Sequence, residues 1–230
     1  MTSDELEERA KQAAGYRAVD AFVRPGTCIG LGTGTTALYA IERAGQLVAA
    51  GTELRAVATS LETERLCREY GIPLVPFCSE PIDVAIDGAD EVAPDWALIK
   101  GGGGALFREK AVALAAQTFV VIVTARKLVE RLGAFGLPLE VVPFSAPYVA
   151  RQIALLGGTF TLRQRAGAPF TSDNGNLIFD CDFGLIEAPA ELDAGLRAVH
   201  GVVATGIFVG LTSHLLISKA DGSVEERSRR

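Results

Sequence analysis

The feature that most constrains the fold is a segment order that recurs between residues 3 and 125. A short apolar run is followed by a loop of glycine or small polar residues, and then by a stretch with helical periodicity. The apolar runs are Thr27–Leu31, Leu54–Ala58, Asp83–Ile86 and Phe119–Val123. The last of these is apolar throughout, which is typical of a strand covered on both faces of a sheet. Repeated strand–loop–helix units predict a Rossmann-like α/β domain, with a parallel sheet and helices on both faces.

The pattern changes after about residue 133. Strand-like segments at Leu139–Val142, Gly157–Arg163 and Asn176–Asp180 alternate with helical stretches at Pro147–Leu156 and Ala190–Val199. This order predicts a smaller inserted α+β (ferredoxin-like) domain over residues 134–204, with a role in oligomerisation. Residues 1–133 and 205–230 then form the sheet domain, and the strands of Ile207–Ser218 are expected to rejoin the first sheet.

Charge and composition narrow the classes of function. The 230 residues carry 22 Lys and Arg against 28 Asp and Glu, a net charge of −6. An acidic balance argues against a nucleic-acid partner, which requires a basic face. No apolar run approaches the ~18 residues of a membrane span, and the acidic start, Met1–Glu8, resembles no secretory signal. We therefore expect a cytoplasmic protein with no membrane partner.

Cysteine and histidine are too few to support several kinds of site. The four cysteines form no C-x-x-C pair, and the chain has only two histidines. The cysteine spacing favours reduced core thiols over a zinc site or a disulfide framework. A histidine-based triad or metal centre is equally disfavoured. Any chemistry is therefore expected to depend on carboxylates, lysines, hydroxyls and backbone amides.

The first candidate motif is Gly30-Leu31-Gly32-Thr33-Gly34-Thr35-Thr36, which lies between a strand and a helix. Glycines allow a ligand to approach the backbone, and amides at a helix N-terminus attract anions. The following strand ends in Thr59-Ser60, without the carboxylate of a dinucleotide site, and no P-loop lysine follows the glycines. A small phosphate fits this loop best; a tight turn with threonine caps is the structural alternative.

The second motif is Asp87-Gly88-Ala89-Asp90-Glu91, directly after a predicted strand. Three carboxylates so close together repel one another unless they are solvated or paired. The motif is either a binding site or an Asx-type surface turn, and the residues alone leave both open.

The third motif is Lys100-Gly101-Gly102-Gly103-Gly104-Ala105-Leu106-Phe107-Arg108-Glu109-Lys110. Four consecutive glycines sacrifice much backbone entropy, which is hard to explain in a simple connector. They allow a lysine and a carboxylate to converge on a small molecule above the N-terminus of a helix. The structural alternatives are that Glu109 complements the helix dipole and that Arg108 and Lys110 form a solvated face.

Together the motifs outline an aldose–ketose isomerase. Moving a carbonyl between adjacent carbons requires a base that carries a proton and a cation that holds the enediolate oxygen. Lys11 and Lys127 are further candidate cations for a phosphate, although a lone lysine of this kind is more often a surface lysine. A metal-assisted hydride shift is the alternative chemistry, which two histidines support poorly.

The three motifs resemble the signatures of type A ribose-5-phosphate isomerase. Lesser matches follow in order at Ala150-Arg151-Gln152-Ile153, Thr171-Ser172-Asp173-Asn174-Gly175-Asn176 and Gly206-Ile207-Phe208. The resemblance implies interconversion of D-ribose 5-phosphate and D-ribulose 5-phosphate in the non-oxidative branch of the pentose phosphate pathway. It also implies a homodimer, in some members a tetramer, that uses neither metal nor cofactor.

The resemblance also implies roles for individual residues. Glu109 would carry the proton between C1 and C2, Lys100 would stabilise the enediolate oxygen, and Asp87 and Asp90 would bind sugar hydroxyls. Asp87 is also a candidate for helping to open the furanose ring, so the implied catalytic residues are Glu109, Asp87, Asp90 and Lys100. The implied substrate-binding residues are Lys11, Thr33, Gly34, Thr35, Thr36, Asp87, Gly88, Ala89, Asp90, Lys100, Gly101, Gly102, Gly103 and Lys127. The chain reads Thr124-Ala125-Arg126-Lys127 where the family often has Asp-x-Ser-Lys, so Arg126 is an alternative cation to Lys127.

Three other functions stay open at this stage. A non-catalytic sugar-phosphate sensor should carry a DNA-binding helix-turn-helix, whereas this chain begins with an acidic helix and lacks a basic patch. Another sugar-phosphate isomerase on the same fold would differ in its substrate. A coenzyme A transferase would need a nucleophilic glutamate and a larger acyl-carrier site, and the glycine run identifies neither.

Overall fold

The computed structural model describes residues 2–229, so Met1 and Arg230, the ends of the expected sheet domain, lie outside the described residues. The chain divides into two compact units. The sheet unit comprises Met1–Ala89, Arg108–Lys127 and Leu211–Arg230, and the small unit comprises Asp90–Phe107 and Leu128–Gly210. This division differs from the expected one mainly because Asp90–Phe107, with the glycine run, belongs to the small unit.

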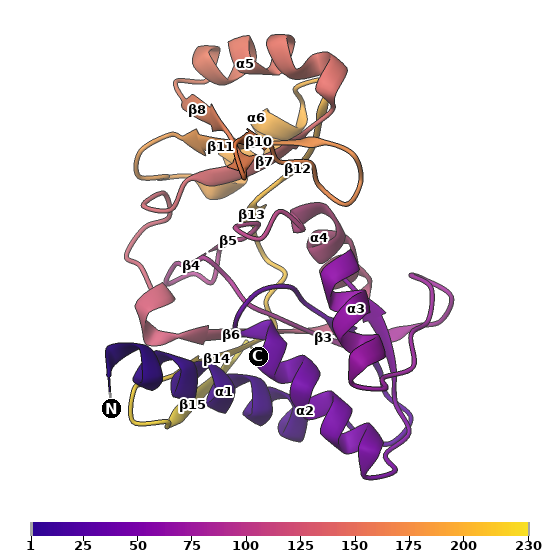
Figure 1. The fold of residues 1–230 in the computed structure, drawn as a ribbon. Coiled ribbons are helices and arrows are strands. Elements are labelled where there is room, and N and C mark those ends of the chain that lie inside the picture. The colour runs from indigo at the N-terminus through magenta and orange to yellow at the C-terminus, as the bar shows by residue number, and fades with distance from the viewer. Residues whose placement is uncertain (1, 230) are drawn as a thin grey trace. The chain divides into compact units, whose positions relative to one another are not determined.

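The sheet unit is built on six strands in the order β15-β14-β6-β3-β1-β2. Their bounds are β1 (Cys28–Leu31), β2 (Arg55–Ala58), β3 (Ile82–Asp87), β6 (Ala116–Thr124), β14 (His214–Ser218) and β15 (Val224–Ser228). Every neighbouring pair from β2 to β14 is parallel, and only β15, at the edge, is antiparallel. The predicted parallel sheet is confirmed. Its carboxyl edge gathers the loops that follow β1, β2, β3 and β6 (Figure 1).

Helices cover both faces of this sheet, as predicted. They are α1 (Ser3–Phe22), α2 (Ala37–Ala49), α3 (Leu61–Glu69) and α4 (Leu106–Ala115). On β1, Ile29 and Leu31 lie in a buried cluster that includes residues of α1, α2 and α3. Gly30 points to the opposite face, where a Cβ would lie 2.4 Å from Val112 of α4. Side chains alternate across a strand, so α4 covers the second face.

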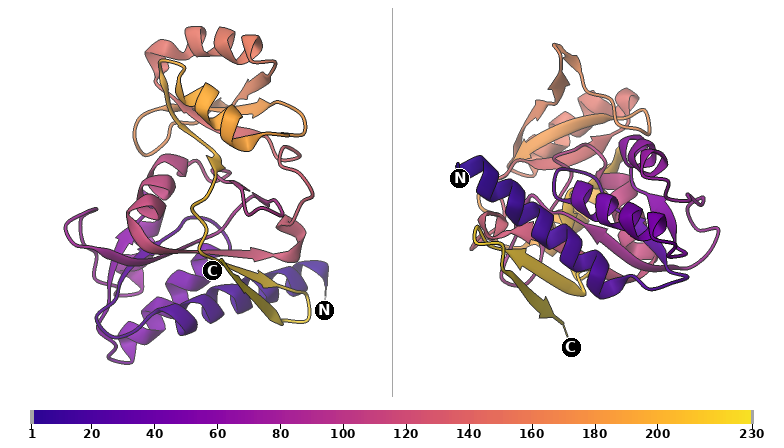
Figure 2. Two further views of the ribbon diagram at one scale, coloured as in Figure 1. Left: turned by 180° about the vertical axis from the view of Figure 1, so that it is seen from behind. Right: turned by 60° about the horizontal axis from the view of Figure 1, so that its bottom comes forward.

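The small unit has the ferredoxin-like order strand–helix–strand–strand–helix–strand. These elements are β7 (Leu137–Val141), α5 (Ala146–Leu155), β8 (Thr159–Leu162), β11 (Leu177–Asp182), α6 (Pro189–Arg197) and β12 (Val202–Thr205). The strands form an antiparallel sheet in the order β12-β7-β11-β8. Val149 and Ile153 of α5 and Leu196 of α6 pack in one buried cluster with Leu139 and Phe179 of the sheet. Figure 2 shows the two helices next to the strands of this unit. The predicted α+β architecture is therefore confirmed.

Short elements complete both units. They are β4 (Glu91–Val92), β5 (Leu98–Ile99), η1 (Ala125–Lys127), η2 (Pro143–Ser145), β9 (Gln164–Arg165), β10 (Ala168–Pro169) and β13 (Ile207–Phe208). The expectation that Ile207–Ser218 rejoins the first sheet is only half right. β14 pairs with β6, but β13 pairs with β5 in a separate three-stranded sheet. Gly210, at φ +72, lies in the segment that separates the two strands.

Within residues 2–229, no helix has both the length and the hydropathy needed to cross a bilayer.

Candidate active site

The glycine–threonine loop after β1 is held by Asp87, the last residue of β3. Asp87 is 3% exposed, and its Oδ1 accepts hydrogen bonds from the amides of Gly88 (2.7 Å) and Thr33 (3.2 Å). A Cβ on Gly32 would lie 2.0 Å from this same oxygen. Gly32 is therefore required because the carboxylate packs directly against the backbone. The first two motifs form a single structure in the sheet unit.

A cluster of hydroxyl groups anchors the other side of this loop. Oγ1 of Thr33 lies 2.8 Å from Oγ1 of Thr59, 2.9 Å from Oγ of Ser60 and 3.2 Å from Oγ1 of Thr63. Thr63 also donates to the carbonyl of Gly32 at 2.8 Å. The hydroxyl of Thr33 is thus hydrogen-bonded to the hydroxyl groups that support the loop, whereas Gly34 and Thr35 are exposed. From the sequence, Thr59 and Ser60 were noted only because no carboxylate follows that strand. Two hydroxyl residues directly after a strand were the signal that could have identified this cluster.

Glu109 lies in the first turn of α4 and is 4% exposed. Val112, three residues further along this helix, packs against Gly30 of β1. Glu109 is therefore one turn nearer to the helix start, which follows the glycine run. In a βα unit this end of the helix lies at the carboxyl edge of the sheet. Two buried carboxyl groups, Glu109 and Asp87, thus belong to the same edge of the sheet unit.

Lys11 lies on α1, which runs beside α2 in the same direction (Figure 1). The contacts advance in step along both helices: Gly15 meets Tyr39, Tyr16 donates to Glu42, and Arg43 donates to Asp20. Lys11 is one turn before Gly15, which places it level with the residues one turn before Tyr39. Those residues are Thr35 and Thr36.

A glutamate holds Lys11 in this position. Glu8 accepts a hydrogen bond from Nζ of Lys11 at 2.6 Å and another from Oη of Tyr39 at 2.7 Å. The hydrogen bond from Lys11, with that from Tyr39, lowers the pKa of Glu8. The same carboxylate raises the pKa of Tyr39 to about 12. Lys11 is thus an ordered ammonium group on α1.

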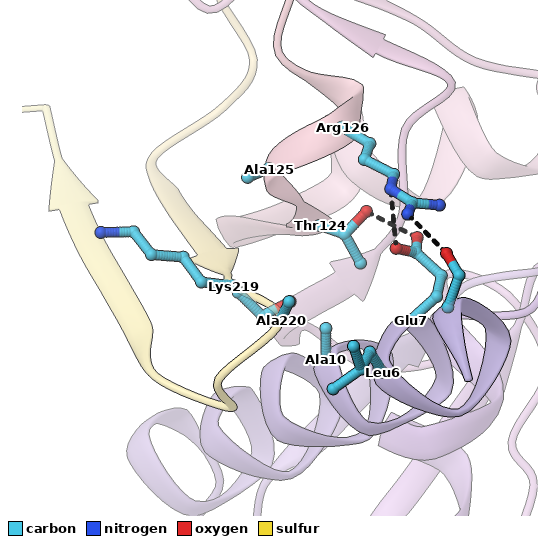
Figure 3. A pocket seen from close by; sticks show the side chains of 10 residues that line it. Leu6, Glu7, Ala10, Thr124, Ala125, Arg126, Lys219 and Ala220 are labelled. Atoms are coloured by element: carbon cyan, nitrogen blue, oxygen red, sulfur yellow. Dashed lines mark hydrogen bonds and ion pairs between the residues drawn. The ribbon is translucent and has the colours of Figure 1, made fainter. Parts of the chain in front are cut away.

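Lys127 and Arg126 occupy η1, directly after β6. Figure 3 shows that Arg126 turns towards α1, where its Nε lies 3.5 Å from Oε2 of Glu7 and its Nη2 donates to Oγ of Ser3 at 3.1 Å. Thr124 also donates to Glu7, at 2.8 Å. These residues line a cavity of about 180 Å³. Arg126 is thus engaged by α1, and Lys127 is half-buried.

In the small unit, Lys100 directly follows β5 and is 2% exposed. Its amide donates to the carbonyl of Gly206 at 2.9 Å, and its Nζ lies 5.6 Å from the ring centroid of Phe208 on β13. A buried ammonium on an aromatic face is stabilised by the ring quadrupole. The Gly206-Ile207-Phe208 match is thereby explained, because it supplies both contacts to Lys100.

Backbone amides resolve the expected repulsion among the three clustered carboxylates. Asp90 Oδ2 accepts from the amide of Gly102 at 2.8 Å, while Glu91, 3% exposed, accepts from Gly133 (2.7 Å) and Phe135 (2.6 Å). Asp87, in the sheet unit, has its own amide partners. Hydrogen bonds of this kind stabilise each carboxylate without a cation. Glu91 is accordingly structural, and Asp90 is tied to the glycine run.

The structure thus distributes the candidate residues between its two units. The sheet unit contains Lys11, Thr33, Gly34, Thr35, Thr36, Asp87, Gly88, Ala89, Glu109 and Lys127. The small unit contains Asp90, Lys100, Gly101, Gly102 and Gly103. Over residues 2–229, no three His, Cys, Asp or Glu side chains gather as a metal site would require. Sequence reasoning missed Arg163, whose side chain donates to the carbonyls of Gly101 and Gly102.

Known proteins share much of the sequence of this chain. The family model for ribose 5-phosphate isomerase A (phosphoriboisomerase A) matches residues 55–222. Ribose-5-phosphate isomerase A of Roseiflexus castenholzii is 47% identical over 220 residues, which cover 94% of each chain. That of Natronomonas pharaonis is 46% identical over 217 residues, covering 94% of this chain and 95% of the relative.

Solved structures of isomerases share the whole fold. Ribose 5-phosphate isomerase from Plasmodium falciparum superposes with a TM-score of 0.92 at 36% identity, covering 97% of this chain and 99% of its own. A D-ribose-5-phosphate isomerase in complex with phospho-erythronic acid has the same TM-score at 33% identity, with both chains fully covered. On its motifs, its fold and these relatives, the chain belongs to the ribose 5-phosphate isomerase A family.

Proposed function

We propose that this chain interconverts D-ribose 5-phosphate and D-ribulose 5-phosphate, with Glu109 as the base. The observation that carries the proposal is the pair of buried carboxyl groups, Glu109 and Asp87, at the sheet edge that also holds the glycine–threonine loop and Lys11. The relatives named above are isomerases of this sugar phosphate.

The chemistry requires a single proton carrier. Glu109 takes the proton from C2 of the open-chain aldose, and the C–H electron pair forms a C1–C2 double bond while O1 becomes anionic. The acid form of Glu109 then returns the proton to C1. The hydroxyl proton of O2 moves to O1, and O2 becomes the ketone oxygen. Lys100 is proposed to neutralise the enediolate oxygen.

We propose that one set of residues binds the phosphate of the substrate and another binds its sugar hydroxyls. The amides of Gly34, Thr35 and Thr36, at the start of α2, suit a phosphate, with Lys11 and Lys127 as the cations. Asp87 and Asp90 are proposed to accept sugar hydroxyls, with Gly88, Ala89 and Gly101–Gly103 supplying backbone contacts. One relative binds phospho-erythronic acid, whose carboxylate presents two oxygens much as an enediolate does. This supports a site made for a phosphorylated enediolate.

The test is turnover of D-ribose 5-phosphate in a coupled assay, with Glu109→Gln as the variant. Its kcat should fall by about three orders of magnitude or more, while KM changes little, because glutamine cannot accept the proton. Glu62→Gln is the matched control, since Glu62 lies in the first turn of α3 but is exposed. Wild-type turnover by Glu109→Gln would refute the base. Binding of the sugar phosphate without turnover in the wild type would favour the sensor.

Two further measurements separate the possible chemistries. Solvent deuterium should enter the product, because the proton resides on Glu109 between the two transfers; complete retention of the substrate hydrogen would indicate a hydride shift. Addition of EDTA should leave turnover unchanged, whereas a loss that added metal restores would overturn the metal-free proposal.

We also propose that the chain works as a homodimer through the small unit. Phe144 on η2 is 95% exposed, and Leu155 on α5 is 79% exposed, with Tyr148 between them also exposed. Large apolar side chains that are exposed on neighbouring elements are typical of an interface. Light scattering should give twice the mass of one chain for the wild type. Phe144→Glu should give a single-chain mass, while Phe77→Glu, an exposed phenylalanine of the sheet unit, should not.

The cellular compartment is inferred from thiol chemistry. All four cysteines are free thiols, and three of them are buried. Free thiols persist in the reducing cytoplasm, so we propose that the protein is cytoplasmic. Expression of a tagged chain followed by fractionation would test this; recovery outside the cytoplasm would refute it.

A further inference from the structure

Arg163 of the small unit contacts the glycine run, and no sequence motif predicted this contact. It follows β8, and its side chain is only 14% exposed. Nη1 donates to the carbonyl of Gly101 at 2.9 Å and to that of Gly102 at 3.0 Å. A single, mostly buried guanidinium therefore bridges two consecutive peptide carbonyls of the third motif.

A second strand holds the guanidinium in place. Nε of Arg163 donates to Oδ2 of Asp180 at 2.9 Å, and Nη2 donates to Oδ1 of the same residue. Asp180 lies on β11, which pairs with β8. The two-point contact with one carboxylate fixes the plane of the guanidinium, so Nη1 has a defined direction. Lysine, with one rotatable ammonium group, could not reproduce this arrangement.

The carbonyl contacts determine which way the amides of the glycine run face. In a trans peptide the C=O and the following N–H point in opposite directions. The Gly101–Gly102 peptide shows this directly, since its carbonyl faces Arg163 while its N–H donates to Asp90 at 2.8 Å. The carbonyl of Gly102 also faces Arg163, so the N–H of Gly103 points away from the guanidinium. Glycine permits this backbone, with φ of +103 at Gly101 and +84 at Gly104.

We propose that Arg163 is a positioning residue for the isomerase reaction: it holds and polarises these two peptides so that the Gly103 amide donates to the enediolate of the substrate. A cation at the carbonyl end of a peptide strengthens the N–H at the other end as a donor. The proposal rests on the proposed function, since it assigns a task to the glycine run of that site. Arg163 itself touches no reacting atom.

Arg165 provides a matched control. It lies two residues further on, and its guanidinium carbon is 4.7 Å from the centroid of Phe170, the ring that Arg163 also approaches, at 6.0 Å. Arg165 is exposed, and within residues 2–229 its side chain makes no hydrogen bond to the glycine run. Removing Arg165 therefore tests the loss of one arginine and one ring contact without touching the two carbonyls.

The experiment compares Arg163→Ala, Arg163→Lys and Arg165→Ala in the full chain. We expect kcat to fall about 100-fold in Arg163→Ala, because a misdirected amide no longer meets the developing charge. Arg163→Lys should lose about 10-fold, and Arg165→Ala should match the wild type. Methylguanidinium at millimolar concentration should restore part of the activity of Arg163→Ala, whereas methylammonium at equal ionic strength should not.

Inhibitor binding distinguishes positioning from simple support of the fold. Phospho-erythronic acid presents a carboxylate to the site, so its inhibition constant should rise in Arg163→Ala in parallel with the loss of kcat/KM. Inorganic phosphate reports only on phosphate binding, so its inhibition constant should not change. Equal weakening of both inhibitors, or full activity in a folded Arg163→Ala, would overturn the proposal.

The remaining outcomes distinguish the positioning role of Arg163 from the proposed isomerase function. If Arg163→Ala fails to fold, Arg163→Lys and Asp180→Asn carry the test, and wild-type kcat in both would refute the positioning role. An inactive wild type would refute the proposed function itself, whatever the variants do. Turnover that depends on Glu109 but not on Arg163 would refute the positioning role alone.

Discussion

Replacement of Gly32 by alanine tests whether Asp87 packs against the backbone of the glycine–threonine loop. The new Cβ would lie 2.0 Å from Oδ1, 2.2 Å from Cγ and 2.6 Å from Cβ of Asp87. Unbonded heavy atoms do not approach a Cβ closer than 3.0 Å, so the carboxylate must move by about 1 Å. Its Oδ1 accepts from both Thr33 and Gly88, and a shift of this size breaks both hydrogen bonds.

The size of the effect follows from these two bonds. Hydrogen bonds to a charged group contribute about 1.5–3 kcal/mol each to stability. The hydroxyl cluster around Thr33 keeps the loop anchored, so the free energy of unfolding should fall by about 3–5 kcal/mol, with no wider collapse. Asp87 is also a proposed substrate ligand, and its displacement should lower kcat/KM by about 100-fold.

Urea unfolding and the coupled isomerase assay measure the two effects. Gly88→Ala is the folding control, because a Cβ there would find its nearest neighbour 3.8 Å away, at the carbonyl of Ile122. Its free energy of unfolding should stay within about 1 kcal/mol of the wild type. Gly32→Ala/Asp87→Gly removes all three of these close atoms, so the double variant should be no less stable than Asp87→Gly alone. Wild-type stability and activity in Gly32→Ala would show that the reasoning is wrong.

Three further predictions concern buried or paired groups. Glu91→Gln should lower the free energy of unfolding, measured in urea, by about 2–4 kcal/mol, because the glutamine amide offers only one acceptor oxygen to two backbone N–H donors. Glu130→Gln, at an exposed position, should leave this free energy unchanged, and equal effects of the two substitutions would contradict the role of Glu91. Ellman's reagent at pH 8 should label only the exposed Cys78 in the native protein, because the other three thiols are buried; a second rapid thiol would contradict this burial. The lowered pKa of Glu8 means that its tie to Lys11 stabilises the fold above its ordinary pKa of 4.5 and is lost as pH falls through the lower folded value. The difference in Tm between wild type and Glu8→Gln should therefore shrink on acidification, and a difference that grew would refute this sign.

Local sequence patterns were sufficient for the architecture. Apolar runs and helical periodicity are properties of neighbouring residues, and they predicted the parallel sheet, the helices on both its faces and the ferredoxin-like unit. The run at Phe119–Val123 lies within β6, a central strand, as its uniform apolarity requires. The short strands β4, β5 and β13 were not predicted as one sheet, because two-residue strands carry no periodicity.

Motifs in the sequence also located the candidate site, but not how its parts hold one another. Lys100, Asp87 and Glu109 stand out because glycines and carboxylates next to strands are costly without a purpose. Nothing in the order of residues shows that Asp87 lies on Gly32, which is 55 positions earlier in the chain. The same holds for Arg163, whose partners in the glycine run are about 60 positions away.

The sequence by itself determined the fold class, the family resemblance and the residue types available for isomerase chemistry. Only the tertiary structure decided that Thr33 binds a hydroxyl cluster, that Arg126 pairs with Glu7 and that Arg163 orients the glycine run. The physical reason is the range of the interactions. Strand and helix preferences act over a few residues, whereas a hydrogen bond or a close contact joins whatever groups folding brings within about 3 Å.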